Sequence, residues 1–187
     1  MFHDILFAFW FLLPVAAANV APILSNKIPL VNRWKAPIDG GRTYLGKDLL
    51  GPHKTWRGLV AGIIAATLVL WVQQLLIAQG YFTATDGLVK NVDYAGLPTL
   101  LLGPLFAIGG LGGDAIESFF KRRRGIQSGG SWLFFDQLDY IVGGILVSLL
   151  FVTLQPVLYV WMIAVWFVMH LLGSYVGYLT GFKDKPI

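Results

Sequence analysis

The sequence predicts an all-α integral membrane protein with five transmembrane helices, and its composition, segment lengths and charge placement all support this class. Of its 187 residues, 56% are hydrophobic and only 13% are charged, with a mean hydropathy of +0.68. A soluble domain carries about 25% charged residues, so this chain is too apolar to be a soluble globule. Its length suits one polytopic domain, residues 1–187. Because the chain has no cysteine, we expect no disulfide and no thiolate metal site.

Five segments meet the requirement of about 20 mostly apolar residues for a membrane-spanning helix. They are residues 5–24, 59–78, 95–113, 138–154 and 156–179. The third is expected to continue as helix into the basic cluster that follows it. Small residues at 16–18 also allow a signal-peptide interpretation of the first segment. Phe2-His3-Asp4 lacks the positive charge that a signal peptide needs, so we interpret this segment as a span.

Lysine and arginine predict the orientation in the membrane. Thirteen of the fourteen fall on one side, in connection 25–57, cluster 121–124 and the C-terminal tail with Lys183 and Lys185, and only Lys90 falls on the other. Cytoplasmic connections carry an excess of these residues. Connections 25–57 and 121–137 are therefore predicted to be cytoplasmic. The N-terminus is then outside, the C-terminus is cytoplasmic, and any chemistry faces the cytoplasm of the cell.

Two polar stripes are predicted where the third and fourth segments meet the cytoplasm, because helical residues three and four apart share a face. The first stripe contains Asp114, Glu117, Ser118 and Lys121. The second contains Asp136 and Asp139. The short loop 125–135, with its Ser-Gly-Gly-Ser run, can fold the two stripes together.

Converging carboxylates repel one another unless a cation lies between them, and Mg²⁺ prefers oxygen ligands. We therefore predict a Mg²⁺ site. Asp136 and Asp139 are its first candidate ligands, Asp114 is the next, and Glu117 is a further candidate. Two alternatives stay open. The acids can form boundary salt bridges with the arginines at 122–124, and acids at a helix start are favoured by the helix dipole.

Basic residues on both cytoplasmic connections are candidates for binding phosphate. The run Gly51–Gly58 combines cations, a hydroxyl and glycines at a predicted helix N-terminus, a setting that binds phosphates. The cluster at 121–124 anchors the span, and its cations can also bind phosphate oxygens directly. The predicted nucleotide- or phosphate-binding residues are Lys54, Thr55, Arg57, Lys121, Arg122 and Arg123.

Two glycine-rich runs need a separate interpretation. Residues 110–115 fit G-x-G-x-x-A, but no strand precedes them, so a dinucleotide site is excluded. These glycines are expected to let two helices approach closely. Residues 39–42 and 46–47 predict turns in the first connection.

These motifs resemble a known family. Ser118-Phe119-Phe120-Lys121-Arg122 followed by Asp136-Gln137-Leu138-Asp139 is similar to the S-x-x-K-R … D-x-x-D signature of CTP:phosphatidate cytidylyltransferases. Gly113-Asp114 and the K-T-W-R-G run at 54–58 resemble the CDP-archaeol synthase family more closely. The H-G-G of the bacterial enzymes is absent. The resemblance covers nearly the whole chain.

The resemblance implies Mg²⁺-dependent transfer of CMP from CTP to a lipid glycerol phosphate in phospholipid biosynthesis. The products are a CDP-activated lipid and pyrophosphate. It implies catalytic roles for Asp114, Ser118, Lys121, Asp136 and Asp139. The partners are CTP, the lipid phosphate and the bilayer, with no nucleic acid. Since the lipid phosphate is already anionic, catalysis needs mainly alignment and charge neutralisation.

Two other functions remain as alternatives. An ion-coupled transporter or channel can also use membrane carboxylates, but the sequence shows no inverted repeat, and its acids lie at one membrane face rather than at the midplane. A polyprenol-type lipid kinase would release a nucleoside diphosphate in place of pyrophosphate.

Overall fold

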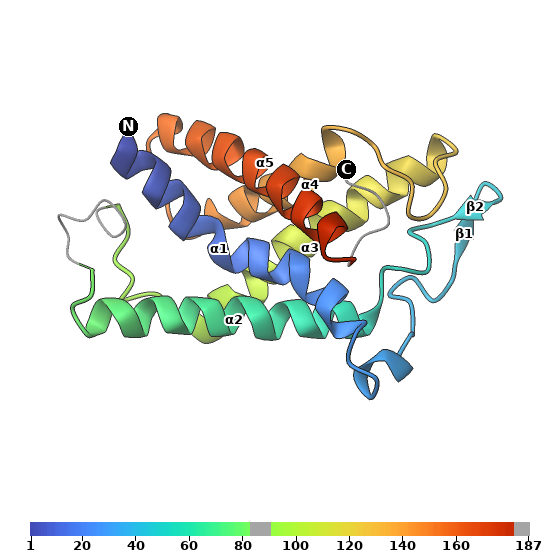
Figure 1. Ribbon diagram of the computed structural model, residues 1–187, viewed down its shortest axis with the longest axis horizontal. Coiled ribbons are helices and arrows are strands. Elements are labelled where there is room, and N and C mark those ends of the chain that lie inside the picture. Colours follow the sequence, from blue (N-terminus) through green and yellow to red (C-terminus); the bar gives the residue numbers. More distant parts are fainter. Residues whose placement is uncertain (83–90, 182–187) are drawn as a thin grey trace.

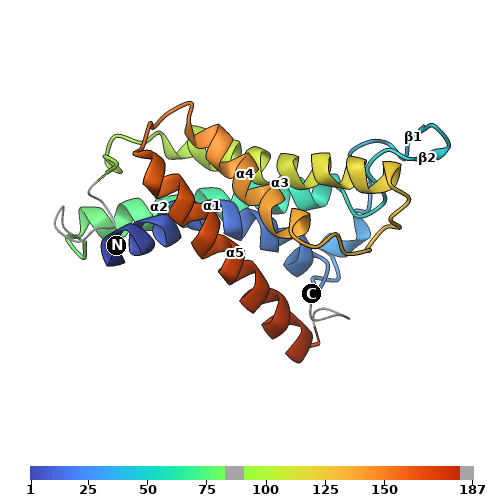
Figure 2. The ribbon, with the colours of Figure 1, turned by 90° about the horizontal axis from the view of Figure 1, so that it is seen from above.

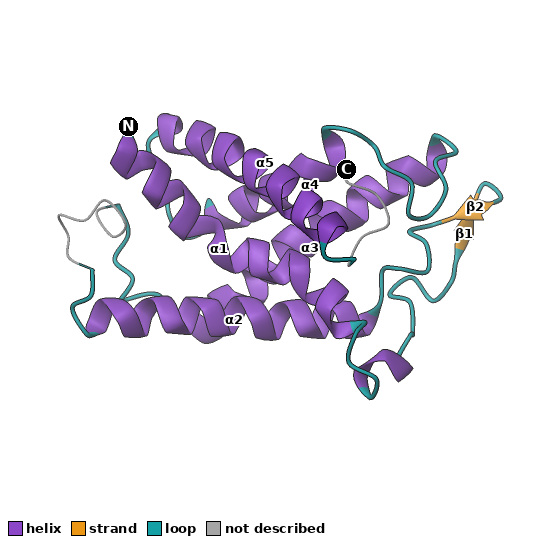
Figure 3. Cartoon of the chain, in the orientation of Figure 1, coloured by secondary structure: helices purple, strands orange, loops and turns teal. Residues whose placement is uncertain are grey.

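The described residues of the computed structural model, 1–82 and 91–181, form a bundle of five helices (Figures 1 and 3). The helices are α1 Phe2–Ser25, α2 Trp56–Ala78, α3 Thr99–Arg123, α4 Phe135–Ser148 and α5 Pro156–Leu179. The α1–α2 connection carries a 3₁₀ turn, Val31–Arg33, and a two-stranded antiparallel hairpin, β1 Thr43–Tyr44 with β2 Lys47–Asp48. The predicted helical class is confirmed.

The connections that carry the predicted site lie at one end of the bundle. Figure 1 shows α2 beginning, α3 ending and α4 beginning at the end that carries the hairpin, while α1 and α5 begin at the opposite end. We call the hairpin-bearing end the polar end. Helices α1, α2, α3 and α5 are each long and apolar enough to cross a membrane. Three cations used in the orientation argument, Lys90, Lys183 and Lys185, lie outside the described residues.

Helix α4 is shorter than the sequence predicts. Its 14 residues reach about 21 Å at 1.5 Å each, less than the roughly 30 Å of a bilayer core. The Ser148 hydroxyl donates to the Ile145 carbonyl (2.7 Å), and the N–H groups of Phe151 and Val152 donate to the Ser148 carbonyl. These bonds close a turn at the helix end. The prediction of one continuous helix over 138–154 is therefore wrong.

The apolar core lies along α1 and is shared by α2, α3, α4 and the first half of α5. Its larger members are Phe7, Phe11, Leu12, Leu70, Tyr94, Leu102, Phe106, Tyr140, Ile141, Leu154, Leu158, Met162 and Trp166. The Trp166 indole N–H donates to the Ala8 carbonyl (3.0 Å), which fixes α5 to α1. Beyond Trp166, α5 buries only Ser174 and leaves the bundle (Figure 2).

Glycines bring α3 and α4 into backbone contact. A Cβ added at Gly113 would overlap the carbonyl oxygen of Asp139, and one added at Gly143 would overlap the carbonyl of Gly109. Small residues let membrane helices approach this closely. The close approach expected from the glycine run of α3 is confirmed, and it brings the start of α4 directly against α3.

Glycine also ends α3 at the point where the predicted loop begins. Gly125 has a φ of +78°, a conformation that favours glycine. Its N–H donates to the Arg122 carbonyl, and the N–H of Ile126 donates to the Lys121 carbonyl, which is the Schellman pattern. The chain therefore turns back toward α4 immediately after the basic cluster.

Candidate active site

The two polar stripes meet at the polar end of the α3–α4 contact. Carboxylate oxygens of Asp114, Glu117 and Asp139 all lie within 4.8 Å of one another. We call these three residues the acid cluster. Since Gly113 packs on the backbone of Asp139, its neighbour Asp114 lies beside that carboxylate. The prediction that the loop folds the two stripes together is confirmed.

Asp136 lies beside the acid cluster and faces Lys121. The Lys121 ammonium is 3.2 Å from Glu117 Oε1 and also pairs with Asp136 Oδ1. The N–H of Trp132 donates to Asp136 Oδ2 (2.9 Å). Burial on its own would raise the pKa of Asp136, but contacts with Glu117 and Lys121 hold that pKa below its usual value. Glu117, rather than Asp136, therefore completes the group of three close carboxylates.

Lys54 reaches the acid cluster from the α1–α2 connection. Its Nζ lies 2.5 Å from Asp114 Oδ2, and the two side chains are 20% and 25% exposed. Nearby, a Cβ at Gly51 would lie 3.4 Å from Ser128 Oγ, so the two polar-end loops touch. Three segments distant in sequence thus enclose the site: residues 51–55, the end of α3 and the start of α4.

The acid cluster can hold a metal ion. Its donors are all carboxylate oxygens, the type that Mg²⁺ and Ca²⁺ prefer. Two ligands of one Mg²⁺ lie at most about 4.2 Å apart, twice the bond length, so small side-chain rotations suffice. The acid cluster and Asp136 carry a formal charge of −4, and Lys54 and Lys121 carry +2. These six side chains therefore carry a net formal charge of −2, which attracts a cation.

Ser118 and Arg122 lie one turn apart on the buried face of α3. They are 6% and 7% exposed, and the Arg122 Nε has no hydrogen-bond partner among the described residues. An ion-pair partner for Arg122 is likewise lacking in that part of the chain. A buried charge without a partner is costly, so this guanidinium suits an anionic ligand.

Thr55 and Arg57 shape the start of α2. The Thr55 hydroxyl accepts from the Gly58 N–H (3.2 Å) and caps the helix. The buried Arg57 guanidinium donates to the Asn32 side chain (2.8 Å) and to that of Asn26. These bonds fasten the segment after α1 onto α2, and phosphate binding by Thr55 and Arg57 stays a prediction.

Arg123 holds the hairpin against α3. Its guanidinium carbon lies 5.3 Å from the Tyr44 ring centre and 4.8 Å from that of Phe119. It also donates to the carbonyls of Lys47 and Asp48, while the Lys47 ammonium donates to the Arg123 carbonyl (3.1 Å). Only Nη2 makes these bonds, and the buried Nε and Nη1 have no hydrogen-bond partner among the described residues, so phosphate binding by Arg123 stays a prediction.

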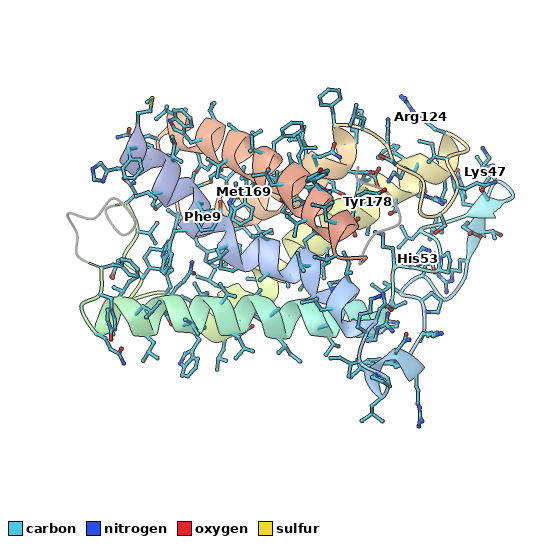
Figure 4. All side chains as sticks on the ribbon, in the orientation of Figure 1. Phe9, Lys47, His53, Arg124, Met169 and Tyr178 are labelled. Carbon is cyan, nitrogen blue, oxygen red and sulfur yellow. The ribbon has the colours of Figure 1, made fainter. Side chains whose placement is uncertain are left out.

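The docked hairpin is the part of the site that sequence reasoning missed. Leu45 and Gly46 have φ values of 53° and 71°, the left-handed pair of a tight hairpin turn, so the turn predicted at 46–47 was its one signal. Figure 4 shows Lys47, His53 and Arg124 together at the polar end. A hollow of about 190 Å³ is lined by Pro37, Asp39, Gly41, Arg42, Asp48, Gly51 and Pro52.

The whole chain is similar to one family. Residues 1–187 match the family described as CarS-like: CDP-archaeol synthase. A CDP-archaeol synthase of Methanospirillum hungatei is 36% identical over 170 residues, covering 87% of this chain and 96% of the relative. One from Methanocaldococcus jannaschii is 30% identical over 189 residues, covering 98% of both. A solved intramembrane enzyme for archaeal membrane lipid biosynthesis has a TM-score of 0.70 at 30% identity, covering 89% of this chain and 92% of its own.

Proposed function

Because the chain belongs to the CDP-archaeol synthase family, we propose that it transfers CMP from CTP to the phosphate of an archaeol-type lipid and releases pyrophosphate. The observation that carries this proposal is the acid cluster, flanked by Lys54 and Lys121 at one end of a bundle of apolar helices. The polar end would bind the nucleotide, and the apolar helix surfaces would leave the lipid tails in the bilayer.

The reaction needs no covalent enzyme intermediate. An oxygen of the lipid phosphate attacks the α-phosphorus of CTP, and a new P–O bond forms. The bond from the α-phosphorus to the oxygen bridging to the β-phosphate breaks, and pyrophosphate leaves with that electron pair. A divalent cation held by the acid cluster, when bound, would neutralise charge on the phosphates. The protein's own task is to align the lipid phosphate with the α-phosphate of CTP and the departing pyrophosphate.

Polar residues of α3 and α4 share this task. Arg122 and Ser118, buried on one face of α3, would bind phosphate oxygens. Lys121 would bind phosphate from the same helix, with Asp136 as the positioning residue that holds its ammonium. In this assignment Asp136 acts on the site through Lys121, whereas Asp114, Glu117 and Asp139 hold the ion.

We assign the polar end to the cytoplasm of the cell, where CTP is available. Most of the chain's cations lie in connections at this end, as the positive-inside rule requires. Helix α4 and residues 149–154 together return the chain to the opposite end, where α5 begins. This gives five crossings, with the N-terminus outside.

The test is pyrophosphate release by the purified protein in lipid nanodiscs. We expect release only when CTP, Mg²⁺ and a lipid phosphate are all present. Ether and ester lipids built on glycerol 1-phosphate and glycerol 3-phosphate will identify the acceptor. Release of CDP would indicate a lipid kinase, and ion flux into liposomes without CTP would indicate a transporter.

Replacing one carboxylate of the acid cluster tests whether the cluster takes part in this reaction. Asp139→Asn should lower turnover by roughly 100-fold or more, because it removes a charged ligand of the ion. Asp48→Asn is the matched control, since Asp48 is exposed on the hairpin and contributes its carbonyl to Arg123. Near-normal turnover of a folded Asp139→Asn protein would contradict the proposed metal site.

A further inference from the structure

We propose that Lys54 is a resident counter-ion of the acid cluster, which a metal ion displaces and which then binds the nucleotide phosphates. This inference rests on the proposed function. Its central observation is the ion pair of 2.5 Å between the Lys54 ammonium and Asp114 Oδ2, because Asp114 is also one of the three clustered carboxylates. One carboxylate thus serves two cations.

The two cations compete at Asp114. An ion bound to that carboxylate would lie within about 4 Å of an ammonium still hydrogen-bonded to it, a separation at which like charges repel strongly. The same ammonium satisfies the carboxylate when no metal is bound, and so stabilises a cluster of acids that would otherwise repel. Metal binding and release of the Lys54 side chain are therefore expected to be one event.

Lys54 rather than Lys121 is free to leave. Lys121 is held on both sides, by Glu117 four residues earlier on the same helix and by Asp136 outside the acid cluster. Lys54 lies in a connection, and its backbone is fixed independently, because its N–H donates to Gly51 and its carbonyl accepts from Ile38. The side chain can swing away without moving the loop.

Release of the Lys54 ammonium makes the site attract phosphate more strongly. Before metal binding, Lys54 neutralises Asp114, so its charge is unavailable to a nucleotide. After displacement, the metal and a free ammonium both attract the triphosphate. Metal binding should therefore raise the affinity for CTP beyond what the ion's own contacts provide, which is a coupling between two ligands.

Amine labelling of the intact protein tests the displacement directly. In nanodiscs without lipid substrate, mass spectrometry would follow modification of Lys54 by an amine-reactive reagent. We expect slow labelling without metal, faster labelling with Mg²⁺, and slow labelling again with Mg²⁺ and CTP. Lys35, exposed in the same connection, is the internal control and should not respond. Labelling of Lys54 that is unchanged or slowed by Mg²⁺ alone would overturn the inference.

A charge-removing variant tests the competition. Lys54→Met should bind Mn²⁺, measured by electron paramagnetic resonance without nucleotide, roughly 5-fold or more tightly, and should bind CTP roughly 5-fold or more weakly. The matched Lys35→Met removes the same charge and should change neither affinity. Changes of opposite sign in the Mn²⁺ and CTP affinities distinguish competition from damage to the site, since damage would weaken the binding of both ligands. Weaker or unchanged Mn²⁺ binding would refute the role of Lys54.

The Asp139→Asn variant keeps the two proposals separate. Loss of Mn²⁺ binding in Asp139→Asn, together with Lys54 labelling that does not respond to Mg²⁺ in the unsubstituted protein, would leave the proposed function in place and remove the role of Lys54. Unchanged Mn²⁺ affinity in Asp139→Asn would instead remove the acid cluster as the metal site.

Discussion

Arg122 and Arg123 are neighbours in the sequence, yet their side chains have opposite surroundings. Arg122 is 7% exposed and has no ion-pair partner in the described part of the chain. Arg123 lies between the rings of Tyr44 and Phe119 and donates to two hairpin carbonyls. Because successive helical residues point about 100° apart, Arg123 faces the hairpin and fastens it, while Arg122 faces away from the hairpin.

Replacing Arg123 should therefore loosen the hairpin. We expect Arg123→Ala to raise the hydrogen exchange of the amides at 43–48, and Arg123→Lys to restore protection only in part, since lysine lacks the planar fork of donors. Arg42→Ala removes the same charge from the same connection and is the control. Exchange measured by mass spectrometry that is equal in Arg123→Ala and Arg42→Ala would refute this role.

At the scale of elements, the α3–α4 contact sets the geometry of the acid cluster. Gly113 and Gly143 let the two backbones touch, and the Asp139 carbonyl lies where a Cβ of residue 113 would be. A larger residue on this face would separate the helices and carry Asp139 away from Asp114. The glycines thus serve the chemistry although they carry none themselves.

Neighbouring glycines of α3 allow a matched test of this contact. Gly113→Ala should destabilise the protein by roughly 1–3 kcal/mol, as overpacking does, and should lower turnover. An added Cβ at Gly112 would meet nothing within 4 Å, so Gly112→Ala should be neutral, or stabilising by up to about 1 kcal/mol through helix propensity. Thermal unfolding in detergent and pyrophosphate release measure both effects. Equal behaviour of the two variants would contradict the packing argument.

At the scale of the whole molecule, the bundle is polarised along its length. The hairpin, the basic end of α3 and the acid cluster share one end, and the middle consists of apolar helices (Figures 1 and 4). Because of this polarity, a water-soluble substrate and a lipid substrate can meet where the polar end borders the membrane. The orientation in the membrane then decides which compartment supplies the nucleotide.

The absence of cysteine makes the orientation simple to measure. A single Cys replacing Lys35 lies at the polar end, and one replacing Tyr81, which is 67% exposed, lies at the opposite end. In intact cells, a membrane-impermeant maleimide should label Tyr81→Cys at once and Lys35→Cys only after lysis. The reverse pattern would place the polar end outside the cell.

The sequence by itself determined the features that depend on neighbours along the chain. Apolar segment length predicted the helices, the spacing of Asp114, Glu117 and Lys121 predicted one polar stripe, and the loop length predicted that Asp139 meets it. These predictions succeeded because helical periodicity and hydrophobicity are local properties. The early end of α4 was not predicted, since apolar composition does not reveal where a turn replaces the helix.

Only the tertiary structure decided which charges pair with which. Lys54 and Asp114 are separated by 60 residues, and Arg123 meets a hairpin about 75 residues earlier. The sequence predicts Asp136 as a metal ligand, and this stays a prediction: in the structure Asp136 pairs with Lys121, while Glu117 lies close to Asp114 and Asp139. The direction of a side chain on a helix follows from its position, but its partner is set by the backbone packed against it, here through the glycine contact of α3 and α4.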